Sequence, residues 1–422
     1  MIHKFKEAYE KYIVTQSLHR TDLEDITSKT KSMIESHIGE EIIPSPVNIP
    51  FSVNSIIKYI NETGLLYSPS LIKRFAFSLM AKRFLILSGL AGSGKTQLAL
   101  AFAKALVEDK EKQMCVVSVG ADWTNREPLL GYPNALKQGE YIKPESGVLD
   151  LLIESNKPEN ANKPFFLILD EMNMSYVERY FADFLSVMES HEPIALWTKC
   201  DNESDSCECD VPEKISLPDN LFIIGTINVD ETTYMFSPKV LDRANVIEFK
   251  ISIDEMTEFL GGIRKINCSS IYNKAAEMGA DFVKLANSKD CDNVEATTET
   301  LKAFFTELKS VNAEFGYRSA IEIFRFINQA HKNDDTAEKM TEAEILDAAI
   351  LQKLLPKLHG SRKKLEPALK ALWGLCFEPS IKDTTQIARE NIKKAIYKES
   401  ADKILRMYES AYTNGFTSFA EA

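Results

Sequence analysis

Two patterns of apolar and polar positions alternate along this chain, one typical of strands and one typical of helices. Short apolar runs bounded by turn residues predict buried strands, and apolar positions that recur every three or four residues predict helices. Between residues 68 and 119 the order is helix, strand, glycine-rich loop, helix and strand, which predicts a β-α-β unit. The expected strands are 84–88, 115–119, 165–169, 221–225 and 245–249. We therefore expect an α/β fold around a central parallel sheet.

Helical patterns flank this core on both sides in the sequence. Residues 1–66 contain short amphipathic patterns that the proline-rich run IIPSPVNIP interrupts, which predicts a small helical N-terminal region and a linker. The sheet and its helices are expected over 67–250. The rest of the chain, 251–422, is expected to form an α-helical lid and C-terminal domain, with helices at 296–315, 319–331, 342–356 and 363–375.

Composition restricts where the protein works and what it contacts. The apolar content of 44% is enough for buried cores, but the longest apolar runs have only strand length, so no membrane span is expected. The first residues lack the apolar segment of a secretory signal, and seven cysteines do not suggest a disulfide framework, so we expect a cytoplasmic protein. The net charge of -12 disfavours a broad nucleic-acid surface. Contact with DNA is therefore expected to be local or made by a partner.

The string GLAGSGKT at 89–96 has the form GxxxxGK[ST] and lies between an expected strand and an expected helix. Glycines let backbone N–H groups close around phosphate oxygens at a helix N-terminus. The lysine neutralises the β and γ phosphates, and the threonine hydroxyl reaches magnesium. The residues expected to hold a nucleotide here are Gly89, Gly92, Ser93, Gly94, Lys95, Thr96 and Gln97.

Two later strands end in polar residues that suit chemistry on such a nucleotide. The strand at 165–169 leads into Asp170 and Glu171. We expect Asp170 to hold magnesium together with Thr96, and Glu171 to polarise the attacking water. The strand that begins at 221 ends in Asn228, which we expect to lie between the other two strand ends and to touch the γ-phosphate or the water.

Two arginines are candidates for contact with the phosphates. Arg243 follows a short expected helix and precedes the last strand, where it could reach a neighbouring subunit's nucleotide and stabilise its transition state. An ion pair within the chain, with Asp242 or Glu248, is the alternative. Arg318 opens an expected helix of the lid and is a candidate for contact with the nucleotide of its own subunit, although a structural role is the alternative there too.

Two further features of the sequence have both a functional and a structural interpretation. Cys200, Cys207 and Cys209 lie in an acidic stretch that is expected to be a hairpin insertion. With His191 they could bind zinc, but their spacing is not that of a common zinc site. Trp123 could face a central pore or a partner, and burial against the core is the alternative reading.

Together, GLAGSGKT, FFLILDEMN, LFIIGTINVDET and FSPKVLDRANVIEF resemble the McrB-like branch of the AAA+ superfamily, which is related to MoxR and dynein-type modules. The resemblance extends over about 68–360. It implies an AAA+ P-loop core with a central parallel sheet and a helical lid, assembled as a homo-oligomeric ring, typically a hexamer, that a nuclease subunit of McrC type joins to restrict foreign DNA. The resemblance implies the roles described above for Lys95, Thr96, Asp170, Glu171, Asn228, Arg243 and Arg318.

The resemblance leaves the nucleotide open. McrB uses GTP and carries Asn-Thr-Ala-Asp-Arg-Ser after its third strand, whereas this chain has NVDETT at 228–233, so ATP and GTP are both retained as substrates, with Mg²⁺. The leading hypothesis is an NTP-hydrolysing ring motor that drives a nuclease on DNA in antiviral defence. The alternative is a MoxR-like chaperone that remodels a protein partner, which the acidic charge slightly favours. A slow regulatory subunit is disfavoured by the presence of Glu171 and Arg243.

Overall fold

A parallel sheet of five strands forms the centre of the described part of the chain. The computed structural model describes residues 49–422 except 138–139, 199–209, 230–233, 235, 263–265, 292–294, 380–385 and 421. The strands lie in the order β2-β5-β8-β1-β9. Their bounds are β1 Phe84–Gly89, β2 Met114–Ser118, β5 Phe165–Asp170, β8 Leu221–Asn228 and β9 Asn245–Phe249. All five expected strands are therefore present, and the expected parallel sheet is confirmed.

Helices cover both faces of the three central strands β1, β5 and β8, which explains why these strands are buried and mainly apolar along their length. Phe166 of β5 stacks on Phe222 of β8, and Phe166 also meets Phe102 of helix α5 (Lys95–Leu106). Side chains of a strand alternate between faces, so Phe84, which is level with Ile223, points to the other face. There Phe84 packs on Phe181, which adjoins helix α10 (Ala182–Ser190).

The remaining elements of the core connect these strands. Antiparallel pairs are formed by β3 (Tyr132–Pro133) with β4 (Tyr141–Ile142) and by β6 (Ile194–Ala195) with β7 (Lys214–Ile215). The other helices of this part are α3 Val53–Glu62, α4 Pro69–Ala81, α6 Lys110–Gln113, α7 Glu127–Leu130, α8 Val148–Ser155, α9 Val177–Tyr180 and α11 Pro238–Leu241, with short 3-10 turns at Pro158–Asn160 and Met172–Met174. Helix α3, which falls in the expected N-terminal region, packs on α4 and α5. Residues 1–48 lie outside the described residues.

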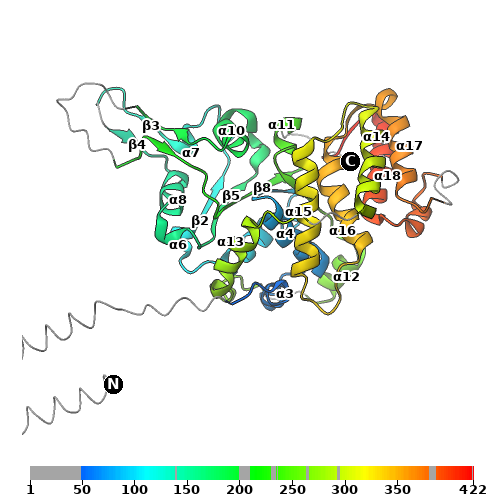
Figure 1. Ribbon diagram of the computed structural model, residues 1–422, viewed down its shortest axis with the longest axis horizontal. Helices are drawn as coiled ribbons and strands as arrows, with labels where there is room; N and C mark the ends of the chain where they lie inside the picture. The colour runs from blue at the N-terminus through cyan, green and yellow to red at the C-terminus, as the bar shows by residue number, and fades with distance from the viewer. Residues whose placement is uncertain are drawn as a thin grey trace, which may run out of the picture. The chain divides into compact units, whose positions relative to one another are not determined.

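Helices are the main elements of the described chain after β9, and α14 to α18 lie to one side of the sheet (Figure 1). They are α12 Ile253–Gly261, α13 Gly279–Asn287, α14 Glu295–Lys309, α15 Tyr317–Asn333, α16 Glu342–Ala349, α17 Arg362–Leu375 and α18 Lys398–Asn414, with 3-10 turns at Ala276–Met278, Leu355–Lys357 and Arg389–Lys394 and a strand pair β10 (His359–Ser361) and β11 (Phe416–Ser418). This arrangement confirms the α/β class expected from the sequence, with a P-loop core on a parallel sheet and a helical region after it.

One expected helix is interrupted. The pattern at 342–356 predicts a continuous helix, but α16 ends at Ala349 and a π-helical turn, Ile350–Leu354, follows it. The wider turn directs the buried Lys353 toward the segment before β9, where its ammonium donates to the carbonyls of Asp242 and Ala244 at 3.2 and 3.0 Å. The sequence pattern alone does not show this change, because a π turn shifts the register by one residue without altering which positions are apolar.

The β6-β7 pair brackets the segment that was expected to be a hairpin insertion, since Ile194 lies opposite Ile215. Cys200, Cys207 and Cys209 themselves lie outside the described residues. Across the residues that the structure describes, no group of three or more His, Cys, Asp or Glu side chains is placed to hold a metal ion. Within the same part of the chain, every helix is too short or too polar to cross a lipid bilayer.

An ion-pair cluster joins the last strand of the sheet to the last long helix. Glu248 of β9 contacts Lys403 and Arg406 of α18 at 2.8 and 2.7 Å. Burial would raise the pKa of Glu248, but these cations and Lys250 outweigh burial and lower the pKa from 4.5 to about 2. Because the pKa of Glu248 is lower in the folded chain than in the unfolded chain, the ionised carboxylate stabilises the folded chain at pH values above about 4.5. This stabilisation is lost as the pH falls from about 4.5 to about 2.

We therefore expect the free energy of unfolding to decrease on acidification, and Glu248→Gln to flatten that dependence. Urea denaturation at several pH values between about 5.5 and 3.5 measures it. Glu409→Gln is the matched control, because Glu409 is an exposed carboxylate of the same helix α18 and should leave the pH dependence as it is in the wild type. Equal slopes for Glu248→Gln and the wild type would contradict the expectation.

Candidate functional site

Three strands end side by side at one edge of the sheet, and each carries polar residues there. Strand β8 lies between β1 and β5, and Asn228 at its end pairs in register with Gly89 at the end of β1. On the other side, Leu169 of β5 pairs with Gly225, so Asp170 comes level with the last residues of β8. The sheet order therefore agrees with the expectation that the third strand lies between the other two.

The loop between β1 and α5 follows a path that only glycine allows at two positions. Gly94 has φ +92°, in the left-handed region, and a Cβ there would lie 2.8 Å from the hydroxyl of Tyr67. A Cβ on Gly89 would lie 2.6 Å from the carbonyl oxygen of Phe249. The loop therefore stays close to its neighbours and ends at the N-terminus of α5, where free N–H groups and the helix dipole favour an anion.

The ammonium of Lys95 lies within this loop. Its Nζ donates to the carbonyl oxygens of Gly89 and Leu90 at 3.0 and 2.7 Å, and lies 3.4 Å from the hydroxyl of Ser93. Lys95 is only 4% exposed, so water screens its positive charge little. A phosphate bound by the loop would therefore meet a positive charge that the fold has already placed.

A cluster of oxygen atoms lies beside this lysine, around Asp170. The hydroxyl of Thr96 donates to Asp170 Oδ1 at 2.7 Å, and the hydroxyl of Thr226 donates to the same oxygen at 2.6 Å. Hydroxyl and carboxylate oxygens are the ligands that Mg²⁺ takes from proteins when phosphates supply the rest. The residues present therefore fit the magnesium role expected of Thr96 and Asp170.

Glu171 and Asn228 contact each other next to this cluster. Asn228 Nδ2 donates to Glu171 Oε1 at 3.0 Å, and the backbone N–H of Glu171 donates to the hydroxyl of Thr226 at 3.0 Å. Glu171 has φ +53° and ψ +46°, a left-handed conformation that is uncommon for a residue with a side chain. Such strain is retained mainly where function requires it. The carboxylate of Glu171 is solvent-exposed and is held by an amide from the neighbouring strand.

Three residues that the sequence analysis did not single out support this arrangement. Thr226 holds both acidic residues, as described above. Asn173 donates from Nδ2 to the carbonyl of Asn228 at 2.9 Å, and Tyr67 donates from its hydroxyl to the carbonyl of Gly94 at 2.7 Å. Thr226 and Asn173 could have been noticed as polar residues within or next to apolar strands, whereas nothing in the sequence distinguishes Tyr67.

Arg243 lies at the other end of the sheet. It precedes β9, whose first residue, Asn245, pairs with Leu85 near the start of β1. Its Nε donates to the carbonyl of Leu185 at 2.9 Å, and its guanidinium also contacts Glu189. Burial lowers the pKa of Arg243. The ion pair within the chain is therefore with Glu189, and not with Asp242 or Glu248 as the sequence analysis had considered.

Arg318 also lies away from the P-loop of its own chain. Its guanidinium contacts Asp242 and lies 3.4 Å from Glu189, and it lines a cavity with Phe84 and Leu221, the first residues of β1 and β8. A strand of this length spans about 20 Å. The structure therefore does not bring Arg318 to the glycine-rich loop at 89–94 of its own chain, and the predicted contact with a nucleotide there has no support from its position.

Two other residues of the sequence analysis have contacts within the chain. Gln97, in the first turn of α5, accepts a weak hydrogen bond from the thiol of Cys268 at 3.5 Å. The indole ring of Trp123 packs edge-on against Tyr180 with their centroids 5.4 Å apart, and its side chain is partly buried. Packing against the core is therefore the observed role of Trp123 in this chain.

Comparisons with known proteins give a family match to part of the chain and several similar solved structures. Residues 268–416 match the family model of a domain of unknown function, DUF8727. No curated protein sequence matches the chain. Among solved structures, a "putative ATPase" from Cytophaga hutchinsonii is similar at 16% identity with a TM-score of 0.47, over 72% of this chain and 86% of that one. A full-length MCM homolog from Methanopyrus kandleri is similar at 11% identity with a TM-score of 0.38, over 74% of this chain and 61% of that one.

Proposed function

We propose that the chain is a magnesium-dependent nucleoside triphosphatase of the AAA+ class, which hydrolyses ATP or GTP. The observation that carries this proposal is the cluster at the strand ends, where Thr96, Asp170 and Thr226 share hydrogen bonds of 2.6–2.7 Å next to Lys95. Phosphoryl transfer needs positioned positive charge, an oxygen-lined metal site and an oriented water more than it needs covalent chemistry. Residues at the carboxyl ends of β1, β5 and β8 supply the positive charge, the metal ligands and the carboxylate that would orient the water.

Each residue then has a defined task. The backbone of 89–94 and the ammonium of Lys95 bind the phosphates. Mg²⁺, when bound, would neutralise part of the phosphate charge, and Thr96 and Asp170 would hold it. Glu171 accepts a proton from the attacking water or orients it, and Asn228, whose amide contacts Glu171 at 3.0 Å, fixes the direction of that carboxylate.

Arg243 and Arg318 suit a neighbouring subunit's nucleotide better than their own. Both contact Glu189 at the end of the sheet opposite to the P-loop. The side chain of Glu189 is 55% exposed, so water weakens its ion pairs with the two arginines. A phosphate of the neighbouring subunit's nucleotide can therefore compete with Glu189 for the guanidinium groups. A ring in which this end of one subunit meets the P-loop of the next would complete the site.

Mixing two inactive variants tests this sharing. Arg243→Ala subunits retain a P-loop, and Lys95→Ala subunits retain Arg243, so a mixed ring contains some complete sites. We expect the mixture to recover part of the phosphate release that each variant has lost, measured at constant total protein. An Arg389→Ala variant, which removes an exposed arginine of the helical region, is the control and should retain full activity. If no mixing ratio restores activity, the shared site is contradicted.

The biological role proposed is that of the McrB-like branch, in which the ring drives a nuclease of McrC type on DNA in antiviral defence. The support for this role is the resemblance of the motifs at the strand ends. A MoxR-like chaperone that remodels a protein partner is the alternative, and the net charge of -12 favours it because an acidic surface repels DNA.

Phosphate release from ATP and from GTP tests both levels of the proposal. Hydrolysis of neither nucleotide would refute the enzyme, whatever its partner. Stimulation by double-stranded DNA together with a nuclease subunit of McrC type supports the restriction role. Stimulation by a protein partner in the absence of any DNA effect supports the chaperone role.

A further inference from the structure

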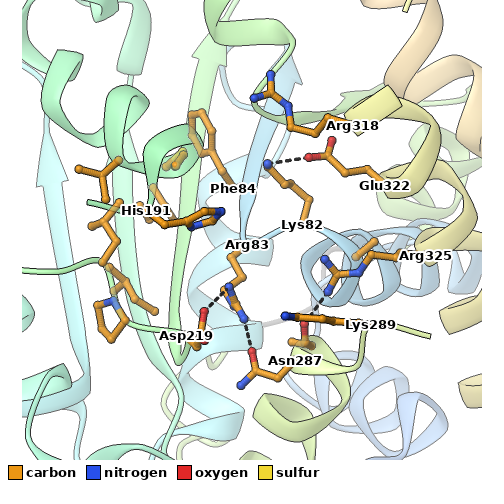
Figure 2. A pocket seen from close by; sticks show the side chains of 18 of the residues that line it. Lys82, Arg83, Phe84, His191, Asp219, Asn287, Lys289, Arg318, Glu322 and Arg325 are labelled. Carbon is orange, nitrogen blue, oxygen red and sulfur yellow. Dashed lines mark hydrogen bonds and ion pairs between the residues drawn. The ribbon is translucent and has the colours of Figure 1, made fainter. Parts of the chain in front are cut away.

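A cavity of about 850 Å³ opens at the end of the sheet opposite to the P-loop (Figure 2). Its floor is formed where β1 and β8 begin, at Phe84 and Leu221, and its sides come from α10, α15 and the end of α13. Pockets for small molecules usually have volumes of about 300–1,000 Å³. The cavity therefore has room for a ligand of nucleotide size, and it is separate from the P-loop.

Cationic side chains outnumber carboxylates around this cavity. Five of its lining residues are lysine or arginine and two are acidic. Lys82 is paired with Glu322 at 2.6 Å, and Arg318 with Asp242. The remaining cations of the lining are Arg83, Lys289 and Arg325.

These three cations are poorly compensated. Arg83 is paired with Asp219 at 2.9 Å, but that carboxylate is 79% exposed, so its screening by water weakens the pair. Among the residues that the structure describes, Arg325 and Lys289 have no carboxylate within ion-pair distance; the guanidinium of Arg325 donates to the carbonyl of Ala286 at 2.9 Å. In Figure 2, Arg325 and Lys289 lie across the cavity from His191.

Two of these guanidinium groups belong to half-buried side chains, and each has one buried, unsatisfied donor. The Nε atoms of Arg83 and Arg325 are inaccessible to water and have no hydrogen-bond partner in the described part of the chain. Burial lowers the pKa of Arg83, which means that its charged form lacks the solvation it has in water. A half-buried charge that has lost part of its hydration costs free energy, and an anion in the adjoining cavity would offset that cost.

The floor of the cavity and the side next to it form one apolar wall. It is lined by Phe84, Val187, Met188, Leu217, Leu221 and Ile223. A simple inorganic anion would leave this wall in contact with water, whereas a ligand with an anionic group and an apolar or flat body would cover both walls. The oxygens of a phosphate match the donors of the guanidinium group, and its charge of up to two suits a site with three cations better than the single charge of a carboxylate.

We propose that this cavity binds an organic phosphate, with the phosphate group held by Arg83, Arg325 and Lys289 and the organic body lying against the apolar wall. This site is distinct from the P-loop and independent of it. A ligand here would contact α15, which carries Arg318, and the start of β1 and β8. It would therefore lie at the same end of the sheet as Arg243.

Calorimetric titration of the Lys95→Ala chain with ADP in EDTA tests the proposal, since that variant and the chelator suppress binding at the P-loop. We expect one ADP per chain, bound more tightly than inorganic pyrophosphate and at least about tenfold more tightly than sulfate, because only ADP covers the apolar wall. Arg325→Gln should weaken ADP binding by about tenfold or more. Lys289→Gln should weaken it by about threefold, because Lys289 is solvent-exposed.

Lys284→Gln is the matched control, because Lys284 is an exposed lysine of α13 that does not line the cavity, and it should leave the affinity unchanged. Thermal melting identifies any variant that fails to fold, and the exposed Lys289 keeps the test valid if Arg325→Gln does not fold. Absence of ADP binding, equal affinity for sulfate, or binding that Arg325→Gln and Lys289→Gln leave unchanged would overturn the proposal. So would a DNA oligonucleotide that binds through these residues when ADP does not.

Discussion

Replacing Lys95 by alanine is expected to abolish nucleotide binding. Lys95 is only 4% exposed, and its ammonium donates to the loop carbonyls of Gly89 and Leu90, so alanine would remove a positive charge that is held at the loop. Removing one partner of a buried charge pair costs about 2–5 kcal/mol, which corresponds to a weakening of roughly 30-fold to several thousand-fold. Calorimetric titration with the non-hydrolysable analogues of ATP and GTP, in the presence of Mg²⁺, measures the loss.

Lys104→Ala provides the control for this experiment. Lys104 lies on the same helix, α5, in its last turn and therefore away from the loop. It should leave both the affinity and the melting temperature close to those of the wild type. Unchanged affinity in Lys95→Ala would contradict the assignment of 89–96 as the phosphate-binding loop, even if hydrolysis were lost for another reason.

Replacing Glu171 by glutamine is expected to separate binding from hydrolysis. The glutamine has the same shape and keeps an oxygen that can accept from the amide of Asn228, but it carries no negative charge and cannot take a proton from water. General base catalysis contributes about 10²–10⁴-fold to such reactions, so turnover should fall by that factor. Nucleotide affinity should stay within a few-fold of the wild type, because the proposed binding of the phosphates by residues 89–96 does not involve Glu171.

Single-turnover measurement of phosphate release, with binding measured separately, checks this expectation. Glu159→Gln is the control, because Glu159 is an exposed carboxylate in the turn Pro158–Asn160, before β5, and should not affect turnover. Normal phosphate release by Glu171→Gln would remove this residue from the chemical step. A parallel loss of affinity would mean that Glu171 contributes to binding or to local folding instead.

Much of the core could be predicted from the sequence because its signals are local. A strand covered on both faces must be apolar along its length, so five short apolar runs predicted all five strands of the parallel sheet. A loop that closes around phosphate needs glycine where no side chain fits, and Gly94 has the left-handed backbone that this requires. Asp170 and Asn228 were expected at the same edge because parallel strands end together.

The tertiary structure alone decided which residues meet across the chain. Thr226, Asn173 and Tyr67 support the strand ends through contacts between segments that are far apart in the sequence, and no local pattern reports such contacts. The position of Arg318 depends on how α15 packs on the core, which the helical period does not specify. The cationic cavity likewise exists only where α10, α13, α15 and the start of β1 converge. Local sequence fixes backbone conformation and burial, whereas the sites formed between elements depend on packing directions that are set by the whole fold.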